Sequence, residues 1–199
     1  HETLDMDITD LDAFRAACEG IDTVIHLAAD RSPSADFYET LLDLNIKGTY
    51  NAFQAAADAG CRRVVFASSV NAILGYTEND HGRVLEDDVM YPPNVYGATK
   101  CWGEALGRVF SHKHGVSSIA VRLGSPRFDQ ARDWDPDRRH GSISERDTAQ
   151  LFGCCVDVED VPFAIVHGSS RHVKSEMDIA DTCRILGYEP QDGTAFPRA

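Results

Sequence analysis

The amino-acid sequence predicts an α/β fold with a parallel sheet and helices on both of its faces. Short apolar runs rich in β-branched residues alternate with longer segments whose apolar residues recur at helical spacing. The apolar runs are continuous, as in strands that are buried on both faces of a parallel sheet. Such strands are joined by right-handed crossovers through helices. The 199 residues can bury the core of one domain, or of one domain plus a small lobe.

The first part of the chain contains five expected elements. Thr3–Ile8 reads as a short strand with an aspartate near its end. Asp10–Gly20 has apolar residues at helical spacing and a closing glycine, which indicates a helix. Asp22–Ala29 is a β-branched apolar run typical of a buried strand. Asp36–Gly60 is a long helix that also ends at a glycine, and Arg62–Ser69 is a further buried strand.

The alternation continues after residue 69. A polar segment with glycine and proline covers residues 70–93, and we expect it to be irregular. The second long helix is Asn94–His114, and Ser117–Gly124 is the strand that follows it. Residues 125–142 are strongly charged and show no clear period, so we expect a loop there.

Three elements complete the expected fold. Ser144–Val158 is a helix whose first turn holds a capping box, Ser144 with Asp147. Phe163–Gly168 is a strand. Ser175–Tyr188 is a last helix, which we expect to end at the glycine before Tyr188.

Composition excludes several classes of protein. The net charge of −13 argues against a nucleic-acid partner, because phosphates would be repelled. No apolar run approaches the ~20 residues that span a bilayer, and no secretory signal pattern is seen. The six cysteines form no CxxC pair and no zinc-ligand spacing. We therefore expect a cytoplasmic protein with reduced thiols, without a metal site and without a membrane partner.

The stretch NVYGATK places Tyr96 four residues before Lys100. On a helix the two side chains share one face. A phenol titrates near ~10 and is a poor base at neutral pH, but a nearby ammonium lowers its pKa. The tyrosine can then exchange a proton with a substrate hydroxyl. The same spacing also occurs on ordinary helices, so the surrounding residues decide between the two interpretations.

Three strand ends supply that context. Ser69 ends a strand, and in α/β sheets the carboxyl ends of the strands face the ligand crevice. It could hydrogen-bond the same substrate oxygen as Tyr96, or serve only as a turn residue. The stretch His26–Ala29, HLAA, offers small residues beside which a flat cofactor could lie, or simple core packing. Asp7 could accept from an adenine amino group, or cap the following helix.

Six segments in order resemble the extended short-chain dehydrogenase/reductases, the NAD-dependent sugar epimerase/dehydratase family. They are DMDITD, VIHLAA, LNIKGTYN, VVFASS, VYGATKCWGE and AVRLGS, from residue 5 to residue 125. FASSVNAILGY, LGSP and LGYEPQD resemble the uronate dehydrogenase branch, which includes sugar dehydrogenases that act at the anomeric carbon. The resemblance implies a Rossmann-like NAD-binding domain over residues 1–125 and a small C-terminal substrate-binding region over residues 126–199.

The resemblance also implies roles for single residues. Tyr96 would be the general base, Lys100 its partner and a ligand of the nicotinamide ribose, and Ser69 the group that positions the substrate hydroxyl. The other residues implied at the cofactor are Asp7, Ile8, Leu27, Ala28, Ala29 and Asn45, the last also holding an active-site water and the backbone. The residues implied at the substrate are Ser32, Ser69, Asn71, Ser125 and Arg139, with Arg138 beside it. The arginine is expected because a uronate carboxylate favours bidentate pairing.

The sequence departs from the family pattern at two places. The Gly-rich turn that receives the pyrophosphate at a helix N-terminus is absent from the 199 residues. We therefore expect the family's first strand–helix–strand unit to be missing from this sequence. Val70 follows Ser69 where uronate enzymes carry an asparagine, which leaves the substrate open. The pair Val70–Asn71 also stands where dehydratases carry Asp-Glu, which disfavours lyase chemistry.

The resulting hypothesis is an NAD-dependent oxidoreductase for a sugar or sugar acid, with hydride transfer from the anomeric carbon and with NADP not excluded. A nucleotide-sugar epimerase that uses the same residues is one alternative. A truncated, non-catalytic cofactor-binding module is another. The resemblance further implies a homodimer in which the two long helices of each copy form a four-helix bundle.

Overall fold

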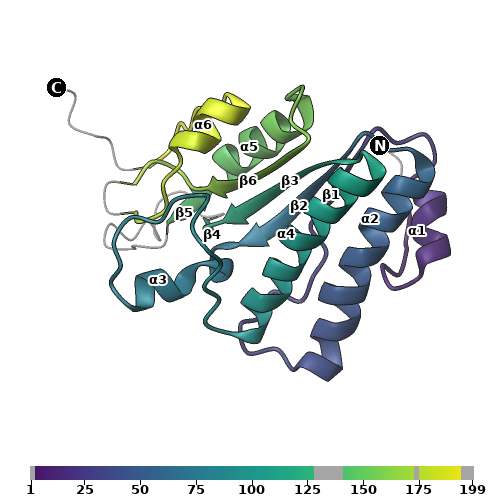
Figure 1. The fold of residues 1–199 in the computed structure, drawn as a ribbon, viewed down its shortest axis with the longest axis horizontal. Coiled ribbons are helices and arrows are strands. Elements are labelled where there is room, and N and C mark those ends of the chain that lie inside the picture. The colour runs from purple at the N-terminus through teal and green to yellow at the C-terminus, as the bar shows by residue number, and fades with distance from the viewer. Residues whose placement is uncertain (1–2, 128–140, 173–174, 194–199) are drawn as a thin grey trace.

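The computed structural model describes residues 3–127, 141–172 and 175–193 (Figure 1). Its main sheet has four parallel strands in the order β1-β2-β3-β6. These strands are β1 (Thr23–His26), β2 (Arg63–Ser69), β3 (Ser117–Leu123) and β6 (Phe163–Gly168). The predicted parallel sheet is therefore confirmed, and β6 shows that the C-terminal region shares it.

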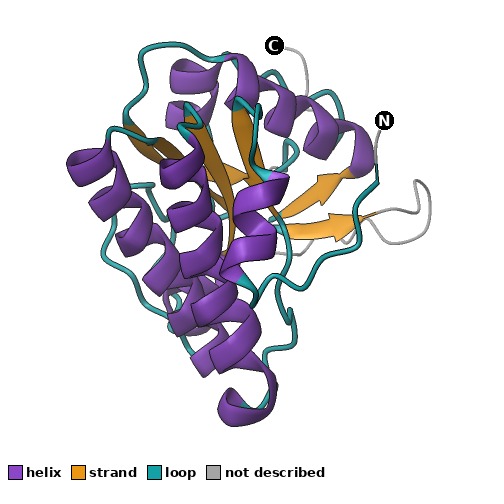
Figure 2. Cartoon of the chain, turned by 90° about the vertical axis from the view of Figure 1, so that its right-hand side faces the viewer, coloured by secondary structure: helices purple, strands orange, loops and turns teal. Residues whose placement is uncertain are grey.

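Helices cover both faces of this sheet (Figures 1 and 2). The helices on one face are α1 (Leu11–Ala17), α2 (Gly48–Ala59) and α4 (Val95–His114), and those on the other are α5 (Glu145–Asp157) and α6 (Ala180–Leu186). Adjacent residues of β2 point to opposite faces: Phe66 enters the core under α2 and α4, and Val65 the core under α5. The strands need continuous apolar runs because alternate side chains of each strand pack into two different cores.

The long helix predicted over Asp36–Gly60 has two parts. The first is a π-helix, η1 (Phe37–Lys47), and the second is α2. The carboxylate of Asp36 caps the start by accepting from two backbone N–H groups, and Gly60 ends the helix at a φ of 74°. A π-helix widens each turn, so residues no longer recur at the ordinary α-helical angle.

Two predicted elements are wrong in part or in whole. Thr3–Ile8 is not a strand, because no described strand pairs with it; the carboxylate of Asp7 instead accepts from the N–H of Thr9 and forms a turn. The last helix covers only Ala180–Leu186 rather than Ser175–Tyr188. Met177 pairs with Val84 in a parallel bridge, so the backbone before Asp178 is extended and cannot be helical.

Two segments predicted to be irregular contain short elements. Residues 70–93 hold a 3-10 turn, η2 (Val70–Ala72), and a short helix, α3 (Leu74–Glu78). The region 125–142 begins with β4 (Ser125–Arg127), which pairs with β5 (Ser142–Ser144) in a separate parallel ribbon visible in Figure 2. Elements of three to five residues are too short to show a period.

The capping box at α5 is half formed. The Ser144 hydroxyl accepts from the N–H of Asp147 at 3.1 Å, as predicted. The Asp147 carboxylate does not return to the cap. It accepts from the Ser170 hydroxyl at 2.5 Å and from the N–H groups of Gln191 and Asp192. A buried carboxylate therefore holds the segment after α6 against α5.

Candidate active site

The first turn of α4 is fixed against the loop that follows β2. The Asn94 side chain caps this helix by accepting from the N–H of Gly97 at 2.8 Å, and its amide donates to Asn71 at 2.9 Å. A Cβ at Gly97 would lie 2.3 Å from the Asn71 carbonyl oxygen. Only glycine permits this close approach, which brings Tyr96 to the carboxyl end of β2.

Ser69 and Tyr96 meet at this edge of the sheet, and both are almost fully buried. The Ser69 hydroxyl oxygen accepts from the backbone N–H of Asn71 at 3.2 Å and from its amide at 3.3 Å. It also interacts with the Tyr96 phenol. Because the oxygen of Ser69 already accepts twice, its own proton is left for the phenol or for an oxygen placed beside it.

Lys100 lies one turn further along α4, with only 5% of its surface exposed. Its Nζ donates to the Ala67 carbonyl at 2.9 Å, and it lies 5.7 Å from the ring centroid of Tyr96 and 5.1 Å from that of Phe66. Burial lowers the pKa of Lys100 to about 8. The predicted spatial pairing of Tyr96 with Lys100 is thus present, although the ammonium is directed to a backbone carbonyl.

The pKa of Tyr96 moves in the direction opposite to our expectation. Burial raises it, the Ser69 hydroxyl opposes this, and the charges of Asp30 and Arg31 act in opposite directions, Asp30 raising it and Arg31 lowering it. The pKa rises because withdrawal of the phenol from water outweighs the effects that lower it, and Lys100 is not among those effects. The site as it stands therefore favours the protonated tyrosine at neutral pH.

Asn45 is a buried bridge between two parts of the site. Its Oδ1 accepts from the N–H of Asp30 at 2.8 Å, and its Nδ2 donates to the Asp30 carbonyl at 2.9 Å and to the Thr99 hydroxyl at 3.1 Å. Thr99 in turn donates to the Tyr96 carbonyl at 2.7 Å. Asn45 therefore holds the loop after β1 against the first turn of α4. Asp30 and Thr99 were not recognised in the sequence, because their roles depend on this contact.

A buried ion pair lies directly beneath the site. The Glu104 carboxylate accepts from the Ser68 hydroxyl at 2.6 Å and from two nitrogens of Arg122, each at 2.9 Å. Sequence reasoning missed this group. Glu104 follows Lys100 by four residues, which puts it on the same helix face and could have indicated it.

The predicted cofactor residues occupy two places. Leu27 and Ala28 are exposed and Ala29 is half-buried, all just beyond β1 at its carboxyl end. The small side chains of Ala28 and Ala29 leave the backbone open, so this edge fits a flat part of a dinucleotide, whereas the Gly-rich turn that would receive the pyrophosphate is not in the sequence. Asp7 is committed to its own turn, and the Ile8 carbonyl accepts from the Asn51 amide. In the described residues no hydrogen bond joins Asp7 or Ile8 to the Tyr96 group.

The predicted substrate residues are gathered only in part. Asn71 bonds directly to Ser69, and the Ser32 hydroxyl lies 3.1 Å from that of Ser34 in the loop after β1. Ser69 pairs with Leu123 of β3, and Ser125, two residues after Leu123, begins β4. Arg138 and Arg139 lie outside the described residues.

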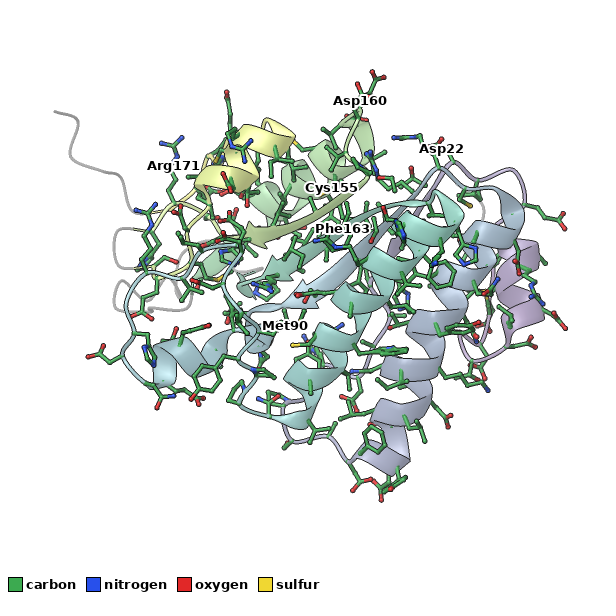
Figure 3. All side chains as sticks on the ribbon, viewed as in Figure 1. Asp22, Met90, Cys155, Asp160, Phe163 and Arg171 are labelled. Atoms are coloured by element: carbon green, nitrogen blue, oxygen red, sulfur yellow. The ribbon has the colours of Figure 1, made fainter. Side chains whose placement is uncertain are left out.

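A hollow of about 880 Å³ opens at the other edge of the sheet, where the strands begin. Figure 3 shows Asp22 and Asp160 at this edge. Asp22 pairs with Arg62 at 3.0 Å, so this acidic region is partly neutralised, and it lies at the opposite end of β2 from Ser69. Among the residues with described positions, no group of three or more His, Cys, Asp or Glu side chains could hold a metal ion. In the same part of the chain, no helix is both long and apolar enough to cross a membrane.

A parallel sheet covered on both faces, with a serine, a tyrosine and a lysine at one strand edge, is the architecture of the short-chain dehydrogenase/reductase class. The family model described as "NAD dependent epimerase/dehydratase family" matches residues 1–127. This chain belongs to that family.

Individual relatives agree with this assignment. An NAD-dependent glucose-6-phosphate dehydrogenase of Haloferax volcanii is 34% identical over 200 residues, covering 95% of this chain and 75% of that enzyme. An L-arabinose 1-dehydrogenase (NAD(P)(+)) of the same organism is 31% identical, covering 96% of this chain and 82% of its own length. A mutant uronate dehydrogenase of Agrobacterium tumefaciens, solved with NAD, has a TM-score of 0.84 at 29% identity, with 96% of this chain and 69% of that chain covered.

Proposed function

We propose that this protein is an NAD-dependent oxidoreductase that oxidises a sugar or sugar acid at its anomeric carbon. The observation that carries the proposal is the convergence of Ser69, Tyr96 and Lys100 at the carboxyl edge of β2. The named activities of the relatives support it, since they act on glucose 6-phosphate, L-arabinose and uronate.

The protein's own groups would handle one proton. Ser69 and Tyr96 would share the anomeric hydroxyl. Ser69 would donate its free proton to that oxygen, and Tyr96, after losing its own proton to solvent, would receive the hydroxyl proton as a phenolate while the C–H bond breaks. Bound NAD supplies the acceptor for the hydride that leaves the same carbon. The product of this two-electron oxidation is a lactone. Lys100 would favour the phenolate electrostatically while its ammonium binds the ribose hydroxyls.

The cofactor and the substrate would use different parts of the chain. We assign cofactor contacts to residues 1–125, with the backbone around Ala28 and Ala29 as the flat surface, and substrate contacts partly to residues 126–199. NAD is the expected cofactor, and NADP stays open. The cofactor assignment can be tested by Ala28→Leu, which should raise the KM for NAD more than the KM for the sugar.

The surface of α4 supports a homodimer. Val95, Trp102 and Val109 are 53%, 39% and 50% exposed and recur every seven residues, with exposed alanines between them at positions 98 and 105. This is the spacing of a helix–helix seam. A second copy would cover it. Sedimentation should show a dimer for the unmodified chain and a monomer for Trp102→Glu.

A reducing compartment fits the cysteines. All six are free thiols, and burial raises the pKa of Cys18 and Cys101 to about 11, which keeps them unreactive. We therefore propose a cytoplasmic location. Fractionation of cells that express the full chain would test it.

The activity test uses the full chain with NAD and a panel of uronates, aldoses and aldose phosphates. We expect NADH absorbance to rise with at least one sugar, and Tyr96→Phe to lower kcat at least about hundredfold. Tyr38→Phe is the matched control, because Tyr38 is 82% exposed and lies on η1. Equal rates for the wild type and Tyr96→Phe, or no NADH from any sugar, would overturn the proposal.

A further inference from the structure

We propose that Arg31 recognises an anionic group, a carboxylate or a phosphate, on the sugar substrate. The inference rests on the proposed function and specifies the substrate as an anionic sugar. Arg139, to which the sequence analysis gave this part, lies outside the described residues and stays a prediction.

The backbone beside Arg31 is fixed relative to Tyr96. Arg31 follows Asp30 in the loop between β1 and η1, at the carboxyl edge of the sheet. Asn45 holds both the N–H and the carbonyl of Asp30 and donates to Thr99, which donates to the Tyr96 carbonyl. The side chains of Asn45 and Thr99 thus connect the backbone next to Arg31 to the turn of α4 that carries Tyr96.

The guanidinium of Arg31 is uncommitted within the described structure. Arg31 is exposed and makes neither an ion pair nor a hydrogen bond with any described residue. Its neighbour Asp30 does not neutralise it, because the Asp30 carboxylate accepts from the N–H of Ser32 at 2.9 Å and from the Thr40 hydroxyl at 2.7 Å. Six other arginines do form ion pairs with carboxylates: Arg15, Arg62, Arg83, Arg122, Arg146 and Arg184.

The charge of Arg31 reaches the reacting group. It lowers the pKa of Tyr96, whereas Asp30 raises it, so both side chains lie within electrostatic range of the phenol. Lys100 is a second cation near the ring, and its Nζ is bound to the Ala67 carbonyl. Among the described residues, Arg31 is therefore an exposed cation placed to meet a ligand that touches Tyr96.

The overall charge favours a local cation at a site that binds an anion. A protein with a net charge of −13 repels anions at long range. A guanidinium offers a planar pair of donors that fits both carboxylate and phosphate oxygens, and it remains charged at every relevant pH. An anionic sugar that places its hydroxyl at Tyr96 and Ser69 would place its oxyanion at Arg31.

The test compares charged and neutral sugars in the full chain. Glucuronate, glucose 6-phosphate and glucose are assayed with NAD for the wild type, Arg31→Gln and Arg31→Lys. We expect Arg31→Gln to lower kcat/KM for whichever anionic sugar is the better substrate by about tenfold to hundredfold, and for glucose by less than about threefold. Arg31→Lys should recover part of the loss. The first two sugars distinguish a carboxylate from a phosphate.

Arg62→Gln is the control, since it removes the same charge at the amino end of β2. The inference is overturned if Arg31→Gln lowers the rates on charged and neutral sugars equally, or if Arg62→Gln gives the same selective loss. Calorimetry of the two anionic sugars in the presence of NAD provides a readout without turnover. If no sugar is oxidised, the proposed function fails. The Arg31 inference is then decided by calorimetry. It holds if Arg31→Gln weakens the binding of the anionic sugars more than that of glucose, and it fails if it does not.

Discussion

Replacing Lys100 with methionine should stabilise the protein while removing its activity. Lys100 is 5% exposed, and burial lowers the pKa of its ammonium from 10.5 to about 8. This difference of about 2.5 pKa units, 10.5 minus 8, corresponds to a cost of about 3 kcal/mol for keeping the folded protein charged at pH 7. Methionine removes that cost but leaves the Ala67 carbonyl without its donor, which costs about 1 kcal/mol. We expect the free energy of unfolding at pH 7 to rise by about 1–2 kcal/mol.

The dependence on pH identifies the cause. The folded-state pKa of Lys100 lies below its unfolded value, so the unfolded chain binds more protons between about pH 8 and 10.5. The stability of the wild type should therefore increase as the pH rises through this window. The Lys100→Met variant lacks that increase, and its advantage should vanish near pH 10.5.

Urea unfolding of wild type and variant at pH 7 and pH 10 measures both effects. Lys113→Met is the control, because Lys113 is exposed in the last turn of the same helix. The reasoning is refuted if Lys100→Met is less stable than the wild type at pH 7, or if the difference is equal at both pH values.

Three further predictions concern packing and buried charge. Gly97→Ala should lower kcat about tenfold or more, because its Cβ would lie 2.3 Å from a backbone carbonyl and displace the start of α4; steady-state kinetics measure this, and an unchanged kcat contradicts it. Glu104→Gln should lower the free energy of unfolding in urea by about 3–5 kcal/mol, because it breaks a buried ion pair. Ser68→Ala should lower it by only about 1 kcal/mol, because it removes one hydrogen bond. Equal losses of stability in the two variants would count against this assignment. Burial lowers the pKa of His26 and His167 to about 4, so stability should fall as the pH drops from about 6.5 to 4, by about 3 kcal/mol for each residue. Thermal melts across this range should lose that dependence in a double glutamine variant, and an unaltered slope would refute it.

The sheet could be predicted from the sequence because burial on two faces leaves a continuous apolar run. β2 and β3 appear in the sequence essentially as they do in the structure. The strand expected at Thr3–Ile8 shows the limit of this reasoning. A strand is a property of a pair, and a local pattern does not contain the partner. The ribbon of β4 and β5 was missed for the same reason, since three residues form a strand only through a distant neighbour.

The proximity of Tyr96 and Lys100 could also be predicted, because the two residues lie on one helix and their spacing fixes it. Ser69 followed from its place at a strand end. The supporting residues could not be found this way. Asp30 and Thr99 are brought together by Asn45, which no local pattern shows, and the raised pKa of the phenol arises mainly because the surrounding elements exclude water.

Two side chains of α4 form hydrogen bonds to consecutive residues of β2. Lys100 bonds to the carbonyl of Ala67, and Glu104, one turn later, accepts from the hydroxyl of Ser68. The helix can neither slide nor roll without breaking both hydrogen bonds, so the proposed proton-transfer geometry is part of the rigid frame. We expect adaptation to a different sugar to change the connecting segments at the rim, whose length and composition can vary without disturbing that frame.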